Sequence, residues 1–100
     1  MPNAVFYVSY KLKKKASVPD FLQASKELND EYISKQKGYI SWKQLVDGKL
    51  WADIATFETM EDAKRFEQST EPNEYAKKFY SYINFFSCKT HFFTVEREYQ

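Results

Sequence analysis

The chain has 100 residues, and 15 Lys and Arg against 14 Asp and Glu give a net charge of +1. This length fits one domain with a small core, and the near-neutral charge gives no general attraction to nucleic acid or to an anionic membrane. Only 2 glycines occur, which excludes the glycine-rich phosphate loops of nucleotide-binding proteins. The 9 Phe, 8 Tyr and 2 Trp are unusually many, and we expect some to line a ligand pocket or a subunit interface.

The cysteine content and the N-terminal sequence indicate the cellular compartment of the protein. One cysteine, Cys88, can form neither an internal disulfide bond nor a Cys-rich zinc site. The N-terminus enters a strand pattern without the features of a signal peptide, and no stretch is long and apolar enough to span a bilayer. We therefore expect a cytoplasmic protein with no metal site and with no nucleic-acid or membrane partner.

The first half of the chain shows strand and helix patterns in turn. Ser17 can cap a helix, and apolar residues then recur at helical spacing until Gly38, a residue typical of helix ends. Asp47-Gly48 is the dipeptide typical of a tight hairpin between two strands. The predicted elements are a strand over 5–12, a helix over 17–38, and strands over 39–46 and 50–57.

The second half predicts a broken helix and a last strand. Thr59 and Asp62 form a capping box, after which Ala63 and Phe66 face inward. The run Glu71-Pro72-Asn73 interrupts this helix, because proline cannot continue it. The predicted elements are a helix from 59 to this break, a shorter helix from 74 through 83, and a strand over 85–97.

The element order β-α-β-β-α-β defines the expected fold. Right-handed crossovers turn this order into a ferredoxin-like α+β sandwich, with a four-stranded antiparallel sheet in the order 4-1-3-2 and the helices on one face. The predicted strands are apolar on both sides, whereas a sheet face in water should be polar. The sequence therefore predicts one domain over residues 1–100 that covers its helix-free face with a second copy.

The hairpin predicts which side chains share a face. A two-residue turn at Asp47-Gly48 places Trp42 opposite Asp53 and puts Tyr39 on the other face. The face that we place towards the helices then carries Trp42, Gln44, Trp51, Asp53 and Phe57. Bulky rings on that face can form the wall of a pocket.

Residues 51–63, WADIATFETMEDA, combine Trp-x-Asp, an aromatic residue four positions on, a Thr that caps a helix, and an Ala. This stretch and the last strand, from Ile83 to His91–Val95, resemble the antibiotic biosynthesis monooxygenase-like group of the dimeric α+β barrel superfamily. The similar layout covers nearly the whole chain. The resemblance implies a homodimer whose two sheets face each other, with a small pocket between the sheet and the helices of each subunit.

The same resemblance implies a choice of chemistries. Some members of the group oxidise polycyclic aromatic substrates with O₂ and without metal or flavin, others degrade haem, and many have no known activity. The haem-degrading members use a helix histidine as iron ligand, whereas His91 is the only histidine here and falls on the last predicted strand. The resemblance therefore implies no cofactor, although no residue here matches the Asn or Arg that the cofactor-free oxygenases tend to use.

Two residues are candidates for catalysis. Asp53 is unusual because Asp is rare inside strands, and it can either accept a proton from a phenolic substrate or bond structurally to a neighbour such as the Trp42 indole, a hydroxyl or His91. His91 is a candidate general base, against a purely structural role. Core packing also explains the aromatic candidates for ligand binding, which are Trp42, Trp51, Phe57, Tyr7 and Tyr82.

Three functions stay open from the sequence. The leading hypothesis is a homodimeric monooxygenase-like protein that binds a small aromatic or apolar metabolite in a pocket between sheet and helices. The first alternative is a cofactor-free oxygenase that oxidises this metabolite with O₂, and the second is a non-catalytic dimer of the same fold with a binding or structural role. The lysine cluster around Lys13–Lys15 fits a solvated loop better than an RNA site.

Overall fold

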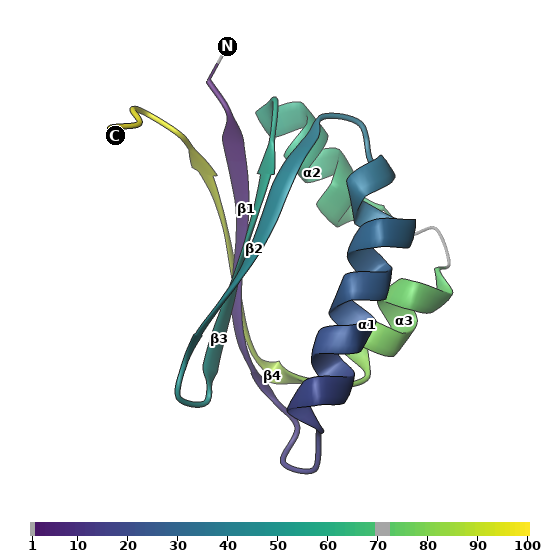
Figure 1. Cartoon of the computed structure of the whole chain (residues 1–100). Coiled ribbons are helices and arrows are strands. Elements are labelled where there is room, and N and C mark those ends of the chain that lie inside the picture. The colour runs from purple at the N-terminus through teal and green to yellow at the C-terminus, as the bar shows by residue number, and fades with distance from the viewer. Residues whose placement is uncertain (1, 70–72) are drawn as a thin grey trace.

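The computed structural model describes residues 2–69 and 73–100. Within these residues, four strands form one antiparallel sheet in the order β2-β3-β1-β4, and the helices cover one face of it (Figure 1). The predicted ferredoxin-like fold and strand order are confirmed. The elements are β1 (Ala4–Leu12), α1 (Val18–Glu31), a 3-10 turn (Ile33–Lys35), β2 (Tyr39–Asp47), β3 (Leu50–Phe57), α2 (Met60–Gln68), α3 (Glu74–Tyr80) and β4 (Ile83–Thr94).

Each helix begins at a side-chain cap. Ser17, Thr59 and Asn73 each accept a hydrogen bond from the backbone N–H three residues on, at 3.3, 3.0 and 2.9 Å. These bonds satisfy N–H groups that have no partner within the first helical turn. The predicted break between the last two helices includes Glu71 and Pro72, which lie outside the described residues.

Two helices end earlier than predicted. α1 ends at Glu31 rather than at Gly38, because the following 3-10 turn is tighter and buries Ile33 against the core. α3 ends at Tyr80, and Ile83 already belongs to β4, where it pairs with Leu12 of β1. β4 in turn stops at Thr94 rather than at 97.

The β2–β3 hairpin turns one residue later than predicted. Its turn residues are Gly48-Lys49 rather than Asp47-Gly48, so Trp42 lies opposite Ala55 and not opposite Asp53. Gly48 has a φ of +60°, which suits a turn that needs glycine at its first position. The register differs by two residues along β3, and every side chain that follows this register therefore keeps its predicted face.

A bulge at the start of β2 corrects the prediction for Tyr39. The pairing with β3 shifts between Tyr39 and Ser41, which interrupts the alternation of side chains along the strand. Tyr39 therefore faces the helices, with its ring 6.4 Å from that of Phe57, rather than lying on the opposite face.

The core lies between the sheet and the helices and consists of two clusters. The larger cluster contains Tyr10, Phe21, Leu28, Ile33, Trp51, Phe79 and Ile83. The smaller cluster contains Ala4, Ala55, Phe57 and Ala63. Trp42 and Phe66 pack against both clusters, so they occupy the region where the two meet.

Gly38 and Gly48 provide a test of the packing between α2 and the residue that precedes β2. Both have positive φ, but a Cβ at Gly38 would overlap the Asp62 carboxyl group, whereas a Cβ at Gly48 would meet nothing within 4 Å. We expect Gly48→Ala to lower the free energy of unfolding by about 1–2 kcal/mol, from backbone strain alone. Gly38→Ala should cost about 3 kcal/mol or more, because overpacking adds to that strain. Equal losses in urea unfolding would contradict this account.

Candidate functional site

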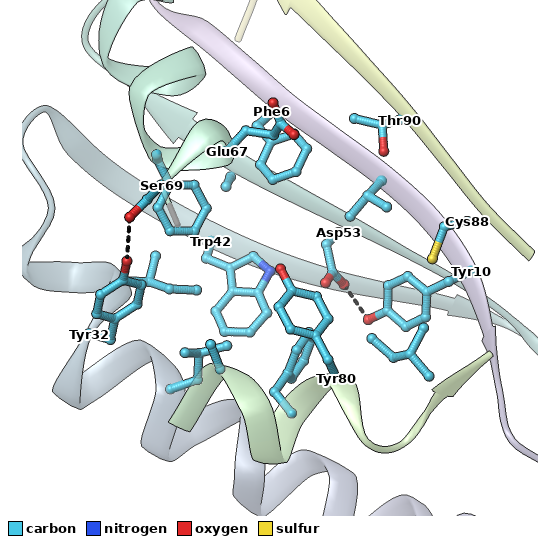
Figure 2. Close-up of a pocket in the computed structure, with 18 of the residues that line it drawn as sticks. Phe6, Tyr10, Tyr32, Trp42, Asp53, Glu67, Ser69, Tyr80, Cys88 and Thr90 are labelled. Atoms are coloured by element: carbon cyan, nitrogen blue, oxygen red, sulfur yellow. Dashed lines mark hydrogen bonds between the residues drawn. The ribbon is translucent and has the colours of Figure 1, made fainter. Parts of the chain in front are cut away.

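A cavity of about 360 Å³ lies between the sheet and its helices (Figure 2). This volume is near the lower end of the range of roughly 300–1,000 Å³ for ligand pockets. Strand residues such as Phe6 and Trp42 form one wall, and Phe66 of α2 and Phe79 of α3 form the other. The walls are therefore mainly aromatic and aliphatic.

Asp53 of β3 places a carboxyl group in this apolar wall. The residue is only 5% exposed, and it lies opposite Gln44 of β2 and Val8 of β1. The Tyr10 hydroxyl donates a hydrogen bond of 2.8 Å to Asp53 Oδ1, as the dashed line in Figure 2 shows. Of the partners expected for Asp53, a neighbouring hydroxyl thus bonds to it, and the Trp42 indole also acts on its carboxyl group, whereas His91 does not.

The environment of Asp53 changes its acidity. Burial raises the pKa of Asp53 from its ordinary value of 3.8 to about 7, and hydrogen bonds from Tyr10 and Trp42 oppose this rise. Burial also raises the pKa of Tyr10, and the nearby Asp53 carboxylate raises it further, so this phenol stays protonated. Near neutral pH, Asp53 therefore exists in both forms and can accept or release a proton.

A second phenol reaches the cavity from α3. The Tyr80 hydroxyl points towards the side of the cavity that holds Trp42 and Asp53 (Figure 2). Burial of this hydroxyl, followed by the charge of Asp53, raises the pKa of Tyr80. The residue as a whole is 44% exposed, so its ring extends from the surface into the cavity.

The rim of the cavity carries further polar groups. Glu67 and Ser69 come from the end of α2 and the residue after it, and the Ser69 hydroxyl lies 3.4 Å from the Tyr32 hydroxyl. Cys88 and Thr90 line the cavity from β4. Glu67, Ser69 and Thr90 are exposed, so these polar groups belong to the solvent-accessible part of the lining, while Asp53 is buried in the wall.

An irregular stretch of β4 shapes the side of the cavity next to α3. The pairing of β1 with β4 shifts between Ser9 and Lys11, where the Lys11 N–H donates to Ser87 Oγ at 2.8 Å. Such irregularities redirect side chains. Here the residues that line the cavity change from the odd-numbered Ile83 and Phe85 to the even-numbered Cys88 and Thr90.

The cavity brings together two of the predicted site residues. Asp53 and Trp42 both line it. Trp51 and Phe57 lie on the same sheet face but are buried in the larger and the smaller core cluster, outside the cavity lining. Tyr82 packs beside the larger cluster, also outside the lining.

The other two predicted site residues lie on the helix-free face. Tyr7 of β1 pairs with His91 of β4, and their rings form a cluster with Phe93, with centroids 5.7–6.0 Å apart. The sheet therefore separates His91 and Tyr7 from Asp53. The structure does not bring the two catalytic candidates together.

Several cavity residues were absent from the predicted site. Phe66 was predicted to face inward on its helix, and this periodicity could have added it to the site. Tyr10 lies on the same face of β1 as Phe6 and Val8, so strand alternation could have added it too. No pattern in the sequence singles out Glu67.

The described residues contain neither a clustered metal site nor a membrane-spanning helix. Across 2–69 and 73–100, no group of three or more His, Cys, Asp or Glu side chains is placed to hold a metal ion. In the same residues, no helix is long and apolar enough to cross a membrane.

Solved structures with the same fold match nearly the whole chain, although no family model and no curated protein sequence matches it. SnoaB, a cofactor-independent oxygenase from Streptomyces nogalater, is 11% identical over 98% of this chain and 97% of its own, with a TM-score of 0.76. A candidate antibiotic biosynthesis monooxygenase from Nitrosomonas europaea is 13% identical over 92% of this chain and 88% of its own, with a TM-score of 0.70. A dimeric ferredoxin-like protein of unknown function from Bacteroides fragilis is 15% identical over 92% and 95%, with a TM-score of 0.62.

These matches define the class of the fold. The chain has a ferredoxin-like fold, and in fold it is similar to solved structures of a cofactor-independent oxygenase and of a candidate antibiotic biosynthesis monooxygenase. At identities of 11–15% the likeness concerns the fold, so the chemistry has to be argued from the cavity itself.

The raised pKa of Asp53 predicts that stability depends on pH. The folded state favours the protonated carboxyl, so this contribution to the free energy of unfolding is complete below about pH 4 and is lost as the pH rises to about 7. The largest loss that this difference allows is about 4 kcal/mol. Asp53→Asn stays neutral, so the stability of wild type relative to this variant should fall over this range in urea unfolding. A constant difference would show that Asp53 titrates normally.

Proposed function

We propose that this chain binds a small aromatic or apolar metabolite in the cavity and oxidises it with O₂ without a cofactor. The observation that carries the proposal is the buried Asp53 carboxyl, with a pKa of about 7, in the wall of an aromatic cavity. An ionisable group in such a place is costly to bury and suits proton transfer.

Asp53 acts as the general base in this mechanism. A base is most effective when its pKa lies near the working pH, and burial brings the pKa of Asp53 to about 7. Tyr10 holds the carboxyl group through the bond to Oδ1. A carboxylate accepts about four hydrogen bonds, so capacity remains for a hydroxyl donor of the substrate.

The substrate supplies the electrons for the oxidation. Asp53 removes a proton from an acidic hydroxyl or methylene group, and the resulting electron-rich anion transfers electrons to O₂. When a methylene becomes a carbonyl, one oxygen atom enters the product and the other leaves as water with both hydrogens. Atoms and electrons then balance without an external reductant, and the apolar walls keep bulk water away from the anion.

The fold match to a cofactor-independent oxygenase supports the oxidation step of this proposal. A second candidate function is ligand binding without turnover. The observation that favours it is the Tyr10 bond, which satisfies Asp53 when no substrate is present. The two candidates share the cavity and differ in what happens after binding.

Oxygen uptake and ligand binding distinguish these functions. With a polycyclic phenol that carries an acidic methylene group, we expect the wild type to consume O₂ and Asp53→Asn to be at least about 100-fold slower. Binding, measured by calorimetry, should persist in Asp53→Asn, which keeps an acceptor for Tyr10.

Asp62→Asn is the matched control, because Asp62 is also a buried carboxyl but lies outside the cavity lining. The Asp62→Asn variant should be less stable, because it loses the ion pair with Arg65, and it should keep full turnover. Binding without O₂ uptake by the wild type would favour the non-catalytic function. Absence of binding would contradict both.

We further propose that the chain is a homodimer through its helix-free face. The ring cluster of Tyr7, His91 and Phe93 lies on this face, and Leu45 and Leu50 are each 47% exposed there. Apolar side chains gathered on one sheet face are typical of interfaces. The dimeric description of the Bacteroides fragilis protein supports this assembly.

A charge on this face should break the dimer. Phe93 is 51% exposed, and Phe93→Lys should give a monomer in light scattering at micromolar concentration, because pairing would bury two lysines against apolar groups. Leu22→Lys is the control, since Leu22 is similarly exposed, at 43%, but lies on α1. A wild-type monomer, or an unchanged mass for Phe93→Lys, would contradict the interface.

A further inference from the structure

The charged side chains that line the cavity all have the same sign. Among its described lining residues, Asp53 and Glu67 are the charged ones, and none is Lys, Arg or His. Asp53 comes from β3 and is buried, whereas Glu67 comes from the end of α2 and is exposed, so we place Glu67 at the rim. Both residues are labelled in Figure 2. A ligand that enters the cavity therefore meets carboxyl groups and no cation.

Three basic side chains of α2 and α3 have contacts away from the cavity. Arg65 of α2 pairs with Glu61 at 2.9 Å and with Asp62 at 2.7 Å. Lys78 of α3 lies 3.5 Å from Glu27 of α1. Lys64 lies over the ring of Phe92, 5.9 Å from its centroid. None of these cations lines the cavity.

We infer that the cavity selects its ligand by charge: it takes neutral aromatic compounds that donate a hydroxyl hydrogen bond to Asp53, and it rejects aromatic carboxylates. This inference rests on the proposed ligand-binding function of the cavity. A carboxylate would lose its hydration among aromatic walls without gaining a cationic partner. It would also lie beside the like charge of Asp53.

Asp53 is the main source of this selectivity. It is buried, and charges in a medium of low polarity interact strongly over short distances. Glu67 is exposed at the rim, where water and salt screen its charge. The hydroxyl of a neutral ligand is therefore expected at the inner end of the cavity.

Among the groups that surround Asp53 in the cavity, only Asp53 itself changes its charge near neutral pH. Tyr10 of β1, Tyr80 of α3 and Cys88 of β4 all have raised pKa values and stay neutral up to about pH 8. Trp42 and Gln44 of β2 do not ionise. Rejection of carboxylates should therefore be stronger at about pH 8 than at about pH 5.5.

Three probes of similar shape test this selection on the whole chain by calorimetry. These probes are 1-naphthol, neutral 1-naphthamide and anionic 1-naphthoate. At about pH 8 we expect the wild type to bind naphthol and naphthamide, and to bind naphthoate at least about 30-fold more weakly, a factor that corresponds to about 2 kcal/mol. At about pH 5.5 the difference between naphthamide and naphthoate should narrow.

Two variants assign the effect to its source. Asp53→Asn should reduce the discrimination between naphthamide and naphthoate about tenfold and make it independent of pH. Glu67→Gln should change it about twofold at most. Glu61→Gln is the control for Glu67, because it removes an exposed charge from the same helix outside the cavity lining, and it should leave the discrimination unchanged.

The outcomes separate this inference from the function on which it rests. If none of the three probes binds, the proposed ligand-binding function is overturned. Charge selection is overturned, and the ligand-binding function stands, if naphthol and naphthoate bind with equal affinity. The same conclusion follows if naphthol binds but naphthamide binds as weakly as naphthoate. A wild-type discrimination that stays constant between the two pH values would overturn the role of Asp53, even if Asp53→Asn failed to fold.

Discussion

The hydrogen bond between Tyr10 and Asp53, 2.8 Å long, joins the two central strands of the sheet beneath the cavity. A buried carboxyl without a donor costs several kcal/mol, whereas one fully surrounded by donors would have a low pKa and little tendency to take a proton. The Tyr10 phenol and the Trp42 indole N–H give Asp53 an intermediate pKa of about 7, because they stabilise the carboxylate less than burial destabilises it. The proton transfer that we propose for Asp53 depends on this balance.

Much of the fold could be predicted, because its signals are local and redundant. The caps at Ser17 and Thr59 and the alternation along the strands define the β-α-β-β-α-β order. The predicted faces survived a wrong hairpin register, since a shift by two residues returns each side chain to its own side of the sheet. The bulge at Tyr39 could not be foreseen, because it depends on how the end of β2 packs against the core.

The site could be predicted only in part. Asp53 was evident as a carboxylate within a strand, and Trp42 followed from sharing its face. Alternation assigns a face but not a position along the strand, so Trp51 and Phe57 were expected at the cavity and instead belong to the two clusters on either side of Trp42. Which part of the sheet face lines the cavity depends on where the helices pack. Their position is set by tertiary contacts and does not follow from strand alternation.

The irregular pairing of β4 also affects how copies of the chain can associate. β4 is an edge strand of 12 residues, and a long regular edge is a template on which other chains extend a sheet and aggregate. Here the Ser87 side chain, rather than a backbone carbonyl, accepts the Lys11 N–H, and the register changes beside it. The run of regular backbone along β4 is thereby shortened, so this edge is a poor nucleus for amyloid-like growth although it is rich in phenylalanine.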